Sequence, residues 1–243
     1  MASTSETGHA KNVSNFENLI VCVISLRANY SPNKLSLQLP QLEALLAQAQ
    51  HLLSDVTDKR SEYRVKVNER QAVFAGLKSL STRLISALKN SDADERLIED
   101  AKSFHLKMHG RRAATKEKTG DDIGATAIAR NSVSQQSYTQ LIQHLDGLIS
   151  ILRRAPAYNP TQSDLQIASL LTLKTELNQK TRAVMDAESD WVDARTIRDN
   201  TFYKGPNSLV EIAAAVKSEI KSTFGVNSPE FTKANKCAFK TIG

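Results

Sequence analysis

Residues 41–75 read QLEALLAQAQHLLSDVTDKRSEYRVKVNERQAVFA and contain neither proline nor glycine. Residues 161–204 form a second stretch with the same property. A helix of about 40 residues is about 60 Å long, so both stretches predict long helices and an elongated molecule. In the first stretch, apolar side chains recur mostly at steps of three and four residues or their multiples: Leu42, Leu45, Ala49, Leu52, Val56, Tyr63, Val67 and Phe74.

The middle of each long stretch is polar, which leaves only a narrow apolar stripe through Tyr63 or Trp191. A stripe of this width, with a period near 3.5 residues, is typical of a helix that pairs with one or two others. The pattern therefore predicts a coiled coil or a slim antiparallel helical bundle.

An internal repeat relates the two halves of the chain. The Tyr-Ser-Pro element at residues 30–32 recurs as Tyr-Asn-Pro at residues 158–160, and apolar positions match in kind over the following forty-five or so residues. Such self-similarity predicts a duplicated, pseudo-twofold architecture. The predicted organisation is a disordered tail (residues 1–12), a first helical repeat (13–110), a basic flexible linker (111–133) and a second helical repeat (134–243). Six aromatic residues are expected to pack within the repeats: Tyr30, Tyr63, Phe74, Tyr158, Trp191 and Phe202.

The composition favours an all-α fold. The 243 residues include only 9 glycines and 6 prolines, whereas a fold built from many tight turns needs more of both. The two cysteines, Cys22 and Cys237, do not suggest a disulfide framework. The polar N-terminus does not resemble a secretory signal, and no apolar run is long enough to span a bilayer. We therefore expect a cytoplasmic protein.

Positive charge is concentrated in one segment. Residues 101–134 hold 7 basic and 3 acidic side chains, while the whole chain has 32 and 26. Such a cluster could contact phosphate groups, but it lacks interleaved aromatic residues for base stacking. A charged linker is the simpler interpretation, and nucleic-acid binding is the alternative. The candidate anion contacts are Lys107, Arg111, Arg112, Lys116 and Lys118.

His105 and His109 stand four residues apart, so a helix would place both imidazoles on one face. A metalloprotease pattern needs a glutamate after the first histidine and a third ligand, and Leu106 occupies the glutamate's place. The preferred interpretation is therefore a solvated helix end, with a metal site as the alternative.

No motif indicates catalysis. The sequence has no glycine-rich phosphate loop, no nucleophile elbow and no Cys/His cluster with metal-ligand spacing. Tyr63 and Trp191 are expected to pack against their neighbours, with a ligand contact as the alternative. We expect no enzymatic activity, no cofactor and no metal.

The repeated Tyr-Ser/Asn-Pro turns and the segment FYKGPNSLV at residues 202–210 resemble features of a group of bacterial all-helical proteins of about this length, with an internal duplication and no known activity. The resemblance covers most of the chain. It implies a soluble bacterial protein and supplies no site residues.

Three functional hypotheses follow. The leading one is a non-enzymatic structural or protein-interaction bundle whose partner is another protein or a second copy of the chain. The second is a membrane-active protein similar in plan to the long-helix pore-forming toxins, acting at a membrane surface. The third is nucleic-acid binding through the basic middle segment.

Overall fold

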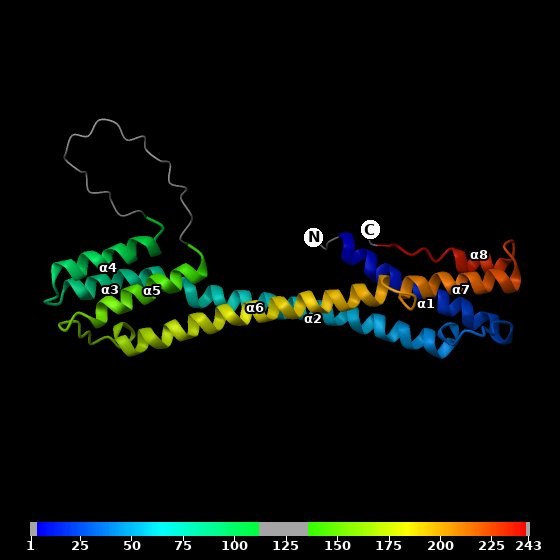
Figure 1. The fold of residues 1–243 in the computed structure, drawn as a ribbon, viewed down its shortest axis with the longest axis horizontal. Coiled ribbons are helices and arrows are strands. Elements are labelled where there is room, and N and C mark those ends of the chain that lie inside the picture. Colours follow the sequence, from blue (N-terminus) through cyan, green and yellow to red (C-terminus); the bar gives the residue numbers. More distant parts are fainter. Residues whose placement is uncertain (1–3, 112–135, 242–243) are drawn as a thin grey trace, which may run out of the picture. The chain divides into compact units, whose positions relative to one another are not determined.

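A computed structural model describes residues 4–111 and 136–241 (Figure 1). Within these two ranges the chain is helical and has no β-strand, which confirms the all-α prediction. The α-helices are α1 (Thr4–Leu26), α2 (Leu39–Ala75), α3 (Leu77–Lys89), α4 (Glu95–Met108), α5 (Tyr138–Arg153), α6 (Ile167–Tyr203), α7 (Leu209–Phe224) and α8 (Pro229–Asn235).

The two long helices, α2 and α6, have 37 residues each. Each follows a short 3₁₀ turn, η2 (Leu35–Leu37) or η3 (Ser163–Leu165). Gln38 and Gln166 are extended, with ψ of 148° and 145°, so each long helix starts only after the turn. Pro40 lies in the first turn of α2, where its missing N–H has no partner to lose.

The N-terminal tail differs from its prediction. Residues 1–12 were expected to be disordered, but α1 begins at Thr4. His9 and Asn12 are buried, and their side chains hydrogen-bond to Tyr203 and, for Asn12, to the backbone of Lys240. Both partners lie more than 190 residues away in the sequence, so the local polar composition gave no sign of them.

The chain divides into two compact units, and the boundaries fall inside the long helices. Unit 1 comprises residues 1–63 and 187–243, and unit 2 comprises residues 64–186. In unit 1, α1 packs against α7 and α8, and η2 packs against α7. The core of unit 1 includes Phe16, Leu42, Phe202 and Val216.

In unit 2, α5 packs on α4, α4 packs on α3, and η3 packs on α3. Its core includes Leu84, Met108, Leu148 and Leu177. Each unit therefore takes segments from both predicted repeats, residues 13–110 and 134–243. The repeat boundaries themselves stay a prediction, and most of the predicted linker lies outside the described residues.

Close packing of α4 on α5 depends on Gly147. A Cβ atom at this position would come within 2.4–2.8 Å of the Phe104 ring. We expect Gly147→Ala to lower the free energy of unfolding by about 1–3 kcal/mol through overpacking, even though alanine is the better helix former. Gly76→Ala is the matched control, because φ at Gly76 is −81° and its Cβ would meet no atom within 4 Å. Urea denaturation measures both variants. A Gly147→Ala protein as stable as Gly76→Ala would contradict this packing.

Residues 112–135 are not described, and the residues on either side of them lie close together in unit 2. The Gln136 side-chain amide donates to the Lys107 carbonyl at 2.7 Å, beside Gly110. We therefore expect that replacing residues 112–135 with a Gly/Ser linker of about six residues leaves the fold intact and stabilises it by about 1 kcal/mol through the shorter loop. Circular dichroism and thermal melts check this expectation. A clear loss of stability would show that residues 112–135 contribute to folding.

Candidate functional site

The histidine pair predicted from the sequence lies at the contact between α3 and α4. His105 Nδ1 is 3.0 Å and His109 Nε2 is 3.4 Å from the Ser81 hydroxyl oxygen, and the two ring centroids are 4.4 Å apart. Ser81 is fully buried and donates its proton to the Lys78 carbonyl at 2.7 Å. The pair thus sits against α3 rather than at a fully solvated helix end.

The ring nitrogens that face α3 lie beside one hydroxyl oxygen and one carbonyl oxygen. With the Ser81 proton on the Lys78 carbonyl, the Ser81 oxygen is an acceptor for His105 Nδ1. His109 Nε2 lies 3.2 Å from the Lys78 carbonyl, which can only accept. No group of three or more His, Cys, Asp or Glu side chains that could hold a metal occurs in residues 4–111 and 136–241.

Burial lowers the pKa of His105, and the nearby basic groups His109, Arg111 and Lys89 lower it further. A folded-state pKa below the unfolded value means that the native state binds fewer protons, so the stabilisation is complete above about pH 6.5 and is lost as the pH falls through the folded pKa.

We therefore expect the unfolding free energy to fall as the pH drops below about 6.5, and we expect His105→Gln to weaken this dependence. Denaturant titrations from neutral to mildly acidic pH measure both proteins. His51→Gln is the control, since His51 is exposed on α2. An unchanged pH dependence in His105→Gln would exclude His105 as its source.

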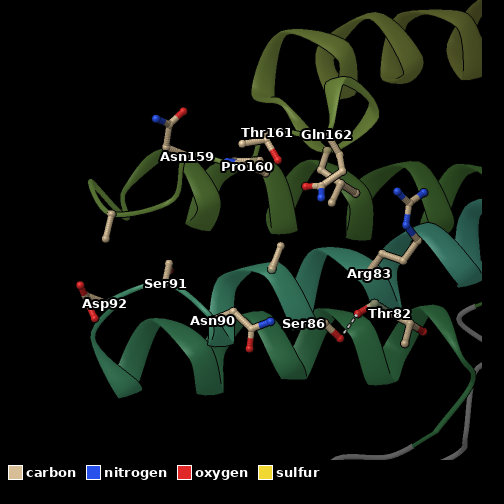
Figure 2. Close-up of a pocket in the computed structure, with 13 residues that line it drawn as sticks. Thr82, Arg83, Ser86, Asn90, Ser91, Asp92, Asn159, Pro160, Thr161 and Gln162 are labelled. Atoms are coloured by element: carbon tan, nitrogen blue, oxygen red, sulfur yellow. Dashed lines mark hydrogen bonds between the residues drawn. The ribbon is translucent and has the colours of Figure 1, made fainter.

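An open polar groove of about 790 Å³ lies between α3 and the segment before η3 (Figure 2). Its walls include Ser86 and Asn90 on one side and Asn159 and Gln162 on the other. The groove has no convergent set of acid, base and nucleophile. Its chemistry suits hydrogen bonding to a polar surface.

Arg83 and Asp164 form an ion pair beside this groove. The second of its two hydrogen bonds joins Arg83 Nη2 to Asp164 Oδ1 at 3.1 Å. The pKa of Asp164 is lowered, with the hydrogen bond from Arg83 as the main cause. Beyond the pair lies a more apolar hollow of about 470 Å³ lined by Leu77, Leu80 and Leu173 among others.

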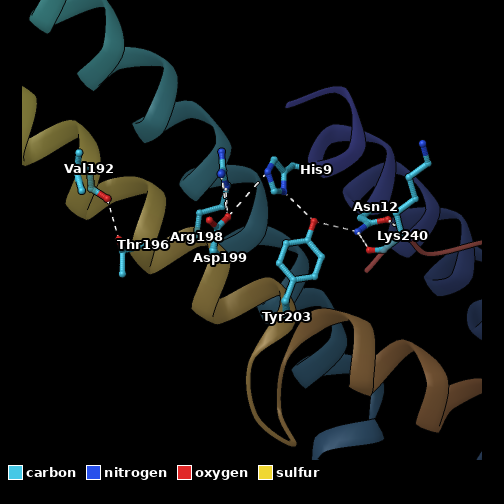
Figure 3. A network of polar contacts seen from close by, with 8 residues as sticks. All are labelled: His9, Asn12, Val192, Thr196, Arg198, Asp199, Tyr203 and Lys240. Atoms are coloured by element: carbon cyan, nitrogen blue, oxygen red, sulfur yellow. Dashed lines mark hydrogen bonds and ion pairs between the residues drawn. The ribbon is translucent and has the colours of Figure 1, made fainter. Parts of the chain in front are cut away.

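A buried polar network in unit 1 joins α1, α6 and the C-terminal segment (Figure 3). His9 Nδ1 lies 2.7 Å from the Tyr203 hydroxyl, and Asn12 Nδ2 donates to the same oxygen at 3.2 Å. Asn12 also pairs with the Lys240 backbone, donating to its carbonyl at 2.8 Å and accepting from its N–H at 2.9 Å. These two hydrogen bonds resemble the paired backbone hydrogen bonds of a β-sheet. They hold the C-terminal segment against α1.

The same network contains a buried arginine. Arg198 is 1 % exposed and donates through Nε and Nη2 to Asp199 Oδ1 at 2.9 and 2.8 Å. His9 Nε2 lies 3.9 Å from the same carboxylate oxygen. No sequence pattern indicates this set, because only the fold brings His9 within reach of α6.

The six aromatic residues predicted to pack fall into pairs of similar environment. Tyr30 donates its hydroxyl proton to the Leu37 carbonyl at 2.9 Å, and Tyr158 donates to the Leu165 carbonyl at 2.8 Å. Burial raises the pKa of both tyrosines to about 12, with smaller contributions from Glu219 at Tyr30 and from Asp164 at Tyr158. Each tyrosine thus closes the turn that precedes a long helix.

The remaining four aromatics lie on the long helices. Tyr63 and Trp191 stack in unit 1 with centroids 5.7 Å apart and planes 22° apart, and the buried Trp191 Nε1 has no hydrogen-bond partner among the described residues. Phe74 meets Tyr138 edge-on at 4.7 Å in unit 2, and Phe202 meets His9 edge-on at 6.1 Å in unit 1.

Of the predicted anion contacts, Lys107 and Arg111 are described. The Lys107 ammonium lies over the Phe104 ring, 5.1 Å from its centroid, and Arg111 is exposed just after α4. Arg112, Lys116 and Lys118 lie outside the described residues.

No protein-family model, curated protein or solved structure matches the chain. The resemblance to a group of bacterial helical proteins stays a prediction. In the described ranges, no helix combines the length and apolar character needed to cross a membrane.

Proposed function

We propose that the protein is a non-enzymatic structural protein that associates with a second copy of itself through an exposed flank of α6. The observation that carries this proposal is the placement of exposed apolar side chains. Leu171, Met185 and Val192 are 38 %, 64 % and 48 % exposed, and their spacings of fourteen and seven residues place them on one face of the helix.

The inward face of α6 uses the same period. Leu170, Leu177 and Val184 are buried and seven residues apart, as are Leu42, Ala49 and Val56 on α2. A seven-residue repeat of buried positions is typical of coiled-coil packing, so we propose that both long helices bury such a seam. A helix with a buried apolar seam and further exposed apolar residues on the flank beside it has a surface suited to another helix.

The pseudo-twofold relationship belongs to the same proposal. Tyr30 and Tyr158 make the same bond at equivalent positions, and α2 and α6 have equal lengths. Phe74 and Phe202 are also equivalent in the repeat. Each packs edge-on against a ring from the first helix of the other half, Tyr138 for Phe74 and His9 for Phe202. These matched contacts support a duplication. The elongated shape stays a prediction.

A second copy is a suitable partner because the stripe is compatible with itself. Two α6 helices aligned antiparallel about the point between Thr181 and Arg182 place Leu171 opposite Val192 and Asn178 opposite Met185. In the same alignment Lys174 faces Ser189, so the alignment does not set this lysine against a like charge. Among the described residues, no comparable observation favours the membrane-active hypothesis or nucleic-acid binding through the predicted linker.

Sedimentation velocity over concentrations up to about 200 µM tests the proposal, because association follows mass action. We expect the wild-type chain to reach twice its monomer mass, and we expect Met185→Glu combined with Val192→Glu to stay monomeric. Val65→Glu is the control, since Val65 is 52 % exposed on α2. A wild-type chain that stays monomeric, or a dimer that survives the double substitution, would overturn the proposal.

A further inference from the structure

The positive charge of the protein belongs to one unit. Unit 2 contains 19 Lys and Arg against 13 Asp and Glu, whereas unit 1 contains 13 of each, so unit 2 holds the entire net charge of +6. The asymmetry does not depend on the segment outside the description. Without residues 112–135, unit 2 still has 15 basic and 10 acidic side chains.

Within unit 2, exposed cations lie along α3 and just after the end of α4. Helix α3 has three basic residues and no acidic one. Lys78 and Lys89 on this helix and Arg111 after α4 are exposed, and none of the three forms an ion pair among the described residues. His105 and His109 adjoin α3 through Ser81 and the Lys78 carbonyl. We call these five residues, Lys78, Lys89, His105, His109 and Arg111, the basic face.

The electrostatic surroundings of His105 agree with this description. The groups that lower its pKa besides burial are His109, Arg111 and Lys89, and all of them are basic. Together with the exposed Lys78 they concentrate basic side chains at this place, which favours an anionic ligand.

We propose that the basic face binds the phosphate backbone of duplex nucleic acid without reading its sequence. Lys78 and Lys89 are eleven residues apart on α3, which is about 16 Å along the helix axis. This distance corresponds to about five base-pair steps of 3.4 Å, so the row of cations can meet several phosphates. Contacts to phosphate alone need no aromatic residues and carry no sequence information.

A membrane surface suits this face less well. A helix that lies on a lipid surface combines basic residues with an exposed apolar face of Trp, Phe or Leu. The large exposed apolar residues of the described chain lie elsewhere, and none of them is on α3 or α4. The basic face thus has the charge that attracts an anionic polymer without the apolar groups that would anchor it in lipid.

Fluorescence anisotropy with a labelled duplex of about 20 base pairs, at pH 7.5 and from 50 to 200 mM salt, tests the proposal. Three permanently charged side chains predict a slope of log K against log salt of about −2.7. We expect Lys78→Glu combined with Lys89→Glu to lower the affinity at least about tenfold. The matched control is Lys221→Glu combined with Lys233→Glu, which changes the net charge equally at exposed positions of α7 and α8 in unit 1.

Circular dichroism melts of all variants establish that they remain folded. The proposal is supported when only the α3 variant loses affinity. It is overturned when the wild-type chain does not bind, when the unit 1 control loses as much, or when vesicles containing phosphatidylserine bind more tightly than the duplex. A loss of binding confined to a variant with Arg112, Lys116 and Lys118 replaced by alanine would also overturn it, because the contacts would then lie outside the basic face.

Discussion

The structure depends on the burial of the apolar residues at the two ends of each long helix against shorter helices. A 37-residue helix with a polar centre and two apolar ends has little to gain from folding alone, because most helical stability in water comes from tertiary packing. The ends of α2 and α6 are covered by short helices: α1, α7 and α8 in unit 1, and α3, α4 and α5 in unit 2. Because each unit uses segments from both halves of the chain, neither half contains a complete core. Both halves are therefore required for either core to form.

Sequence reasoning succeeded where the signal was local and periodic. The absence of proline and glycine from residues 41–75, together with the apolar spacing, led to a helix within two residues of its observed start at Leu39. It was less successful where contacts with residues far away in the sequence determine where a helix begins. The turn after Pro160 is a 3₁₀ turn closed by Tyr158, so α6 starts at Ile167, six residues later than the predicted stretch. The helical start of α1 was missed because its polar residues are satisfied by the other end of the chain.

The candidate sites show the same division. The spacing of His105 and His109 correctly predicted one helical face, but the buried Ser81 that orients both rings belongs to α3, and no pattern in the sequence links it to them. No sequence pattern indicates the network of His9, Asn12 and Tyr203, because its members are far apart in the sequence and only the fold brings them together. Residue type and spacing can indicate a face of one helix, whereas contacts between helices require the tertiary structure.

The bonds between Asn12 and Lys240 also bear on how the chain could be reconnected. These bonds hold α1 beside the C-terminal segment. Gln136 likewise contacts Lys107, on the other side of residues 112–135. A fold whose two ends are adjacent tolerates a circular permutation, in which the old termini are joined and new ones opened elsewhere. A permuted gene that starts at residue 136 and finishes at residue 111 would thus encode the same helices in exchanged order, with the second half preceding the first.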